Sequence, residues 1–217
     1  MVEWEKMAAA AALLTLAGCE TMADPYAGAR PLVAVEEEPE WRGLATAHDI
    51  DHLEAVDEAW AAALEEARGR GYRAAIDGEG ALLDPAAALP RAAPPPGPYR
   101  CRIVKLGSQS PRGRPFNAYK PYFCYVEVDE DYLSITKQTG SERPAGWLYE
   151  DGEADRLIFL GTLVRGTERA TLPYGEDAER DMAGIVERVG PFRYRLVIPW
   201  PQHESKLDVI ELVPVTD

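Results

Sequence analysis

The sequence has few of the residues that mark a catalytic or metal-binding centre. Its 217 residues include three histidines and three cysteines, and no two cysteines form a C-x-x-C pair, which argues against zinc. It contains no G-x-S-x-G element, P-loop or dinucleotide-binding fingerprint. These are common signatures of serine hydrolases, nucleotide hydrolases and dehydrogenases. The sequence therefore predicts no metal, no cofactor and no identifiable catalytic residue.

His48 and His52 form the one arrangement typical of a metal ligand pair. They are four residues apart, so they share one helix face, and Asp49 and Asp51 lie between them. However, the general-base glutamate of H-E-x-x-H is missing, and the only other histidine is His203. We interpret the cluster as a solvated polar face at a helix N-terminus, where acids suit the helix dipole.

Bases are outnumbered by acids, 23 to 37, and the formal charge of −14 argues against a nucleic-acid partner. The stretch between Asp84 and Glu127 nevertheless holds seven bases and no acid, so its charge is +7 and the remainder carries −21. One interpretation is an anion-binding or partner-docking loop with Arg112 and Arg114 at its tip. The alternative is that these bases pair with surface acids and contribute little. The seven bases are Arg91, Arg100, Arg102, Lys105, Arg112, Arg114 and Lys120.

A long hydrophobic run is also missing near the N-terminus. Residues 7–17 are eleven uncharged, mostly apolar residues, whereas about 20 are needed to span a bilayer. This length is typical of the hydrophobic region of a signal peptide. The alternative is a buried helix rich in alanine and leucine.

Leu16-Ala17-Gly18-Cys19 resembles the lipobox of bacterial lipoproteins. The resemblance implies a signal peptide over residues 1–18, lipidation of Cys19 and a lipidated tether over 19–40. Glu3 and Glu5 depart from the positive start that such signals usually have. The expected location is periplasmic and lipid-anchored. The outer membrane is favoured over the inner by analogy with lipoprotein sorting rules, because Glu20 rather than an aspartate follows the cysteine.

The remaining residues, 41–217, are predicted to form one globular α+β domain that is mainly antiparallel β. A stripe of apolar residues at spacings of three and four predicts a helix over 46–70, followed by a proline-rich connection over 85–98. The part from 99 to 214 predicts about eight strands in a meander sheet or small barrel, on which the helix packs. The predicted strands are 99–106, 122–128, 132–139, 146–150, 156–164, 185–189, 192–198 and 207–213.

Cys101 and Cys124 lie in the first two predicted strands. They are the only cysteines outside the lipobox, and in an oxidising compartment they are expected to form a disulfide. The alternative is a pair of buried free thiols that pack as small hydrophobic groups.

Several short motifs resemble a bacterial family known as domain of unknown function 4893. The resemblance covers most of residues 41–214 and implies a secreted or lipid-anchored envelope protein, but it brings no activity. The motifs are Tyr99-Arg100-Cys101-Arg102, Lys105-Leu106-Gly107, residues 139–144, residues 159–162, Tyr174-Gly175 with Arg180-Asp181, and residues 204–209.

These observations favour a monomeric, non-catalytic binding or structural module whose partner is an envelope protein or an anionic ligand. Arg112, Arg114 and Arg143 are the candidate binding residues, although Arg143 also suits an ion pair within its own chain. One alternative is an inhibitor of an envelope hydrolase, since the plan is similar to lipoprotein protease inhibitors. The other is an enzyme, which would show a deep pocket where acids converge, whereas a binding module would show a filled barrel. Its candidate residues are Glu142, Arg143, Asp181, Glu204 and Asp208.

Overall fold

An antiparallel β-barrel forms the larger part of the protein. The computed structural model describes residues 38–168 and 172–215. The signal peptide, Cys19 and residues 19–37 of the tether lie outside the described residues. The strands are β1 (Gly97–Leu106), β2 (Phe116–Ala118), β3 (Tyr122–Asp129), β4 (Tyr132–Lys137), β5 (Glu142–Glu150), β6 (Arg156–Arg165), β7 (Asp181–Gly190), β8 (Arg193–Pro199) and β9 (Leu207–Pro214).

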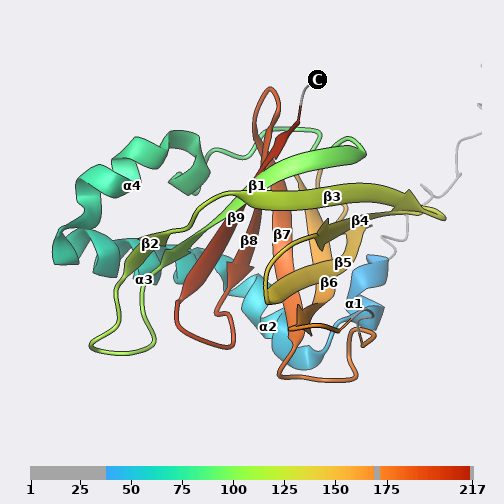
Figure 1. Ribbon diagram of the computed structural model, residues 1–217, viewed down its shortest axis with the longest axis horizontal. Helices are drawn as coiled ribbons and strands as arrows, with labels where there is room; N and C mark the ends of the chain where they lie inside the picture. Colours follow the sequence, from blue (N-terminus) through green and yellow to red (C-terminus); the bar gives the residue numbers. More distant parts are fainter. Residues whose placement is uncertain (1–37, 169–171, 216–217) are drawn as a thin grey trace, which may run out of the picture. The chain divides into compact units, whose positions relative to one another are not determined.

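Eight of these strands close into a ring in the order β1-β3-β4-β5-β6-β7-β8-β9, and β9 pairs back with β1 (Figure 1). The short β2 is an extra strand that pairs with the end of β1. The predicted mainly antiparallel β fold is therefore confirmed, and the sheet is closed. Each of the eight predicted strands overlaps one of β1 and β3–β9, although β5 and β7 begin four residues earlier than predicted, and β2 was not predicted.

The segment before the barrel is helical in several pieces. Thr46 caps α2 by accepting a hydrogen bond from the Asp49 amide, as the T-x-x-D pattern suggests. The helix expected over 46–70 is interrupted at Ala55, and Gly71, with φ of 91°, turns the chain between α3 and α4. The helices are α1 (Glu40–Leu44), α2 (Ala47–Glu54), α3 (Val56–Ala67), a π turn (Arg68–Tyr72), α4 (Arg73–Glu79) and a 3₁₀ turn (Gly80–Leu83).

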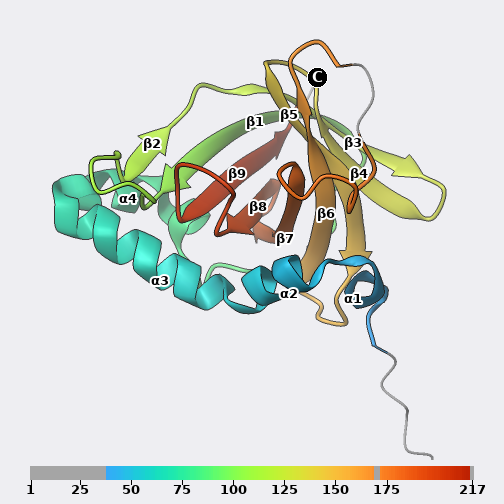
Figure 2. The same ribbon diagram turned by 90° about the horizontal axis from the view of Figure 1, so that it is seen from below.

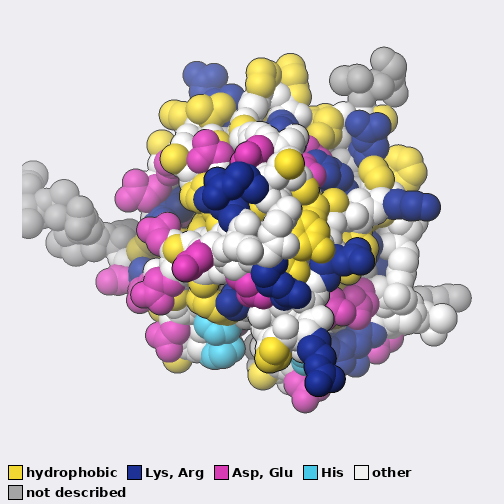
Figure 3. Space-filling model, turned by 90° about the vertical axis from the view of Figure 1, so that its left-hand side faces the viewer, with side chains coloured by type: hydrophobic (Ala, Val, Ile, Leu, Met, Phe, Trp, Pro, Cys, Tyr) yellow, Lys and Arg dark blue, Asp and Glu magenta, His cyan; other side chains and the backbone are white. Residues whose placement is uncertain are grey.

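The helices run along one side of the barrel (Figure 2). Buried Trp60 and Leu64 of α3 share an apolar cluster with Val104 of β1 and Val209 of β9. Burying such side chains is the main favourable contribution to folding. On the side that carries α3 and α4, acidic and basic side chains are interspersed around exposed hydrophobic atoms (Figure 3).

One end of the barrel is filled by inward-facing side chains. Tyr99, Tyr194 and Leu212 are buried there together with the disulfide between Cys101 and Cys124, whose Cα atoms are 5.9 Å apart. A cross-link that closes a loop of this length contributes roughly 3 kcal/mol in the chain-entropy account. The predicted disulfide is present, and this end of the barrel has a packed core.

Two glycines allow Phe159 to cover this core. Gly146 and Gly161 are opposite each other on β5 and β6, and a Cβ on Gly161 would lie 2.5 Å from the Phe159 ring. Only a residue without a side chain leaves room for the ring at this place. Leu163, two residues beyond Gly161 on the same face of β6, is where the interior becomes hollow.

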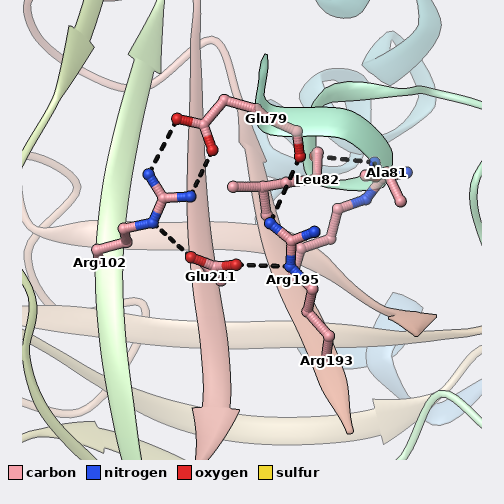
Figure 4. A network of polar contacts seen from close by, with 7 residues as sticks. All are labelled: Glu79, Ala81, Leu82, Arg102, Arg193, Arg195 and Glu211. Carbon is pink, nitrogen blue, oxygen red and sulfur yellow. Dashed lines mark hydrogen bonds and ion pairs between the residues drawn. The ribbon is translucent and has the colours of Figure 1, made fainter. Parts of the chain in front are cut away.

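The outer wall carries a network of charged groups under the 3₁₀ turn (Figure 4). Arg102 donates to both Glu79 and Glu211, and Arg193 donates to Glu211 at 2.5 Å. Because Glu79 ends α4 while the other three groups lie on strands, these ion pairs fasten the helical segment to the barrel. The hydrogen bonds that Arg102 donates to Glu79 and Glu211 hold the pKa of Arg102 above its ordinary value.

Arg195 lies under the same 3₁₀ turn and is fully buried. Its guanidinium donates to Glu187 at 2.6 Å and to the carbonyl oxygens of Leu82 at 3.1 Å and Asp84 at 2.7 Å. Its Cζ also lies 5.0 Å from the ring centroid of Trp60. A buried cation needs such complete pairing, because desolvation without partners is costly.

Replacing Arg195 with methionine removes the cation and keeps most of its volume. We expect the free energy of unfolding to fall by roughly 3–5 kcal/mol, because Glu187 and the carbonyls of Leu82 and Asp84 would lose their donor. Urea denaturation measures this loss. Arg100→Met is the matched control, since Arg100 is exposed, and should change stability by about 0.5 kcal/mol or less. Equal losses in the two variants would contradict this role.

Candidate functional site

The end of the barrel opposite the packed core contains a cavity of about 720 Å³. It is reached where β1, β4, β6 and β8 end and where β3, β5, β7 and β9 begin. Side chains alternate between the two faces of a strand, so every second residue near these strand ends points inward. The apolar part of the lining includes Ile103, Leu163, Met182, Ile198 and Ile210.

Lys105 and Asp208 form an ion pair in the cavity at the seam that closes the barrel. They are directly opposite in the β1–β9 register, with Nζ and Oδ2 3.3 Å apart, and Lys105 Nζ also lies 2.9 Å from Glu204. Burial raises the pKa of Asp208, although Lys105 and the Ser205 hydroxyl act against this rise. Burial acts against the charge of Lys105, yet Asp208 and Glu204 hold its pKa above the ordinary value. The charge of Lys105 is therefore balanced by acids of the same chain.

Lys137 is a second lysine of the cavity, with a different environment. It ends β4, and its Nζ lies 4.3 Å from the ring centroid of Tyr122 on β3. Within the described residues its ammonium makes no hydrogen bond and no ion pair. Burial lowers the pKa of Lys137, and Arg143 and Lys105 lower it further, while Glu142 acts in the opposite direction. Burial also raises the pKa of Tyr122, so its hydroxyl keeps its proton and can donate it in a hydrogen bond.

The rim beside α2 is acidic. The Tyr174 hydroxyl donates to Asp49 and accepts from the Thr46 amide at 3.1 Å. Asp181 is buried, and one of its oxygens accepts from the Gly175 amide at 3.0 Å. Its other oxygen has no partner among the described residues. Burial raises the pKa of Asp181, the Gly175 amide lowers it, and nearby Asp49 raises it again.

His52 lies on the same rim. Its ring centroid is 4.1 Å from that of His48, and burial and the neighbouring His48 both lower the pKa of His52. Across residues 38–168 and 172–215, no group of three or more histidine, cysteine or acidic residues is placed to hold a metal ion. No helix in that same part of the chain is long and apolar enough to cross a membrane.

The structure brings together four of the five residues named for a possible enzyme. Glu142, Asp181, Glu204 and Asp208 all line the cavity. Arg143 is not in the lining, because its guanidinium donates to the carbonyl oxygens of Gly140, Gly166 and Glu168. Arg143 therefore ties the β4–β5 turn to the loop after β6.

Arg112 and Arg114 lie away from the cavity, in the exposed loop between β1 and β2. Arg70 reaches this loop from the α3–α4 turn and donates to the carbonyl of Gly113 at 2.7 Å. The loop therefore adjoins the exposed arginines of that turn, on the side seen in Figure 3. Of the seven bases in the acid-free stretch, two, Arg102 and Lys105, form ion pairs with acids.

Sequence reasoning missed Lys137 and Tyr122 as site residues and saw Lys105 only as one of seven bases. All three occupy inward positions near strand ends, so a polar residue in an otherwise apolar inward series was the available signal. That signal places a side chain inside the barrel. The signal does not predict which lysine forms an ion pair with an acid, because that pairing depends on strands far apart in sequence.

Comparison with known proteins gave one match. The family described as "Domain of unknown function (DUF4893)" matches residues 41–212 of the chain. No curated protein and no solved structure matches the chain.

Replacing Asp181 with asparagine tests the cost of its unpartnered oxygen. The pKa of Asp181 is raised above 3.8, so this group favours the folded state at low pH and that benefit is lost as the pH rises through its folded-state pKa. At neutral pH we expect Asp181→Asn to stabilise the protein by on the order of 1 kcal/mol, because it removes a buried charge. The gain should shrink as the pH falls toward 3.8.

Urea denaturation at both pH values measures this effect. Asp129→Asn is the matched control, because Asp129 is exposed at the far end of β3. A destabilised Asp181→Asn protein at neutral pH would show that the carboxylate charge is needed for folding.

Proposed function

The chain belongs to the DUF4893 family, and we propose that it is a non-catalytic binding module whose barrel cavity holds one small molecule. The observation that carries this proposal is the cavity of about 720 Å³. Small-molecule sites have volumes of roughly 300–1,000 Å³ and combine an apolar wall with a few polar groups. The lining residues of this barrel meet that description.

The shape of the barrel supports the same proposal. An eight-stranded barrel is just wide enough either to be filled by its own side chains or to hold one small ligand. Here both arrangements occur in one barrel. Tyr99, Phe159 and Tyr194 fill one end, and the other end contains the open cavity. A barrel that is filled at one end and hollow at the other is suited to holding a ligand.

Six acids in the lining favour a second candidate, an enzyme; they are Glu142, Asp181, Glu204 and Asp208, together with Asp49 and Glu179. Acid–base catalysis needs a carboxyl group that is free to exchange a proton with a substrate. Glu204 and Asp208 are both bound to Lys105, and Asp181 accepts from the Gly175 amide. Because Lys105 holds Glu204 and Asp208, and Asp181 keeps only one oxygen without a partner among the described residues, we place the binding module first.

Filling the cavity tests the binding proposal. The uncharged probe N-phenyl-1-naphthylamine fluoresces in apolar surroundings, and we expect it to bind the wild-type protein. Met182→Trp places an indole in the lining and should weaken binding by about tenfold or more through steric exclusion. Fluorescence titration measures the affinity, and thermal unfolding verifies that the variant is folded.

The control is Val128→Trp, which adds the same indole at a position that is 61% exposed and outside the cavity. It should bind the probe as the wild type does. A wild-type protein that binds no probe, or a Met182→Trp variant with unchanged affinity, would contradict the proposal.

We further propose that the module is anchored to a bacterial membrane through Cys19, on the periplasmic side and preferably at the outer membrane. The support is the lipobox-like sequence Leu16-Ala17-Gly18-Cys19. Two or more acyl chains anchor a protein stably, since each buried methylene contributes about 0.8 kcal/mol. The loop with Arg112 and Arg114 would then be available to an envelope partner, including a hydrolase that the module inhibits.

Labelling cells with a fatty-acid analogue tests the anchor. We expect the label on the wild-type protein and its complete loss in Cys19→Ser, because the thiol is the acylation site. Cys124→Ser removes a cysteine outside the motif, together with its disulfide to Cys101, and should keep the label. Unchanged labelling and membrane fractionation of Cys19→Ser would rule out the anchor.

A further inference from the structure

We propose that the cavity selects a ligand that joins an apolar body to a single carboxylate, and that Lys137 binds this carboxylate. This inference rests on the proposed binding function and adds the class of ligand. It starts from the contrast between the two lysines of the cavity, Lys105 and Lys137, of which only Lys105 has acids bound to it within the described residues.

A lysine that is partly withdrawn from water without a counter-charge is costly, because its ammonium loses hydration and a contact with an aromatic ring replaces only part of it. Lys137 lies against the Tyr122 ring inside the cavity, and Glu142, the acid that raises its pKa, forms no ion pair with it. The chain therefore leaves a cation in the cavity for an external anion. A charge-assisted hydrogen bond would offset the lost hydration.

The surroundings of Lys137 suit an anion. The Tyr122 ring from β3 lies against it, and the charges that act on it are Lys105 on β1 and, on β5, Glu142 in the lining and Arg143 outside it. Two of these groups are cations, and only one is an acid. The Tyr122 hydroxyl has no hydrogen-bond partner within the described residues, so it is free to donate to a second carboxylate oxygen.

The rest of the lining defines the remainder of the ligand. Deeper in the barrel the walls are apolar, with Ile103 and Ile210 opposite each other on β1 and β9 and Met182 on β7. Burying an apolar body there gains roughly 25 cal/mol per Å² of apolar surface. The acids at the rim, Asp49 and Asp181 among them, repel ligands with several negative charges. A single carboxylate on an apolar chain or ring satisfies both conditions.

Displacement of N-phenyl-1-naphthylamine by matched competitors tests this inference. Dodecanoate, dodecanol and dodecylamine share one apolar chain and differ in head group. We expect dodecanoate to displace the probe from the wild type at the lowest concentration. In Lys137→Met its affinity should fall by about tenfold or more, the effect of one lost charge-assisted hydrogen bond, while dodecanol should be unaffected.

The pH dependence gives an independent readout. The pKa of Lys137 lies below 10.5, so the dodecanoate affinity of the wild type should fall as the pH rises from neutral toward that value. Lys137→Arg keeps its charge over this range and should keep its affinity. Lys120→Met, which removes an exposed lysine outside the cavity, is the control for charge loss and should bind dodecanoate like the wild type.

The outcomes separate the two proposals. If the probe and dodecanol bind and Lys137→Met leaves dodecanoate affinity unchanged, the binding function stands and the carboxylate inference is wrong. Preference for dodecylamine over dodecanoate would also overturn the inference. If neither the probe nor any competitor binds the folded wild type, the proposed binding function itself is wrong.

Discussion

The antiparallel pairing of β1 with β9 is the constraint on which the rest of the structure depends. It joins residues about a hundred positions apart and turns a meander into a closed barrel. Closure removes the exposed sheet edges along which strands of other molecules pair. It also fixes the interior width, since strand number and stagger determine a barrel's diameter. A cavity can exist only because this seam holds the two ends of the sheet together.

The seam itself differs along its length. Toward the packed end, Cys101 and Leu212 are opposite each other and are fully buried, and toward the open end Lys105 is opposite Asp208. The apolar pair excludes water and supports the core, whereas the ion pair gives the open end a wall that keeps its charges satisfied. Between these two pairs, the apolar pair Ile103–Ile210 already lines the cavity, so the interior becomes hollow one inward-facing pair before the charged pair.

The strands of this barrel were predictable because their signals are local. Alternating residues and turn sequences such as Asp151-Gly152 define each strand without reference to its neighbours. Closure was not predictable, because an open meander and a barrel share the same sequential hairpins and differ only in the β1–β9 pairing. The division of the helix at Ala55 was missed for a related reason, since no glycine or proline marks it. Likewise, the acids of the site were named from motifs, while their gathering in one cavity is a property of the closed ring.

The two cavity lysines show why residue type alone does not identify a site. Lys105 and Lys137 both end a strand segment on its inward face, but only Lys105 lies opposite an acid across the closing seam. The residue opposite Lys137 is Cys124, which is committed to the disulfide and cannot neutralise a charge. The disulfide that strengthens the packed end thus also leaves Lys137 without a counter-charge on the neighbouring strand. The cross-link that stabilises the core and the available cation beside it are therefore consequences of the same strand register.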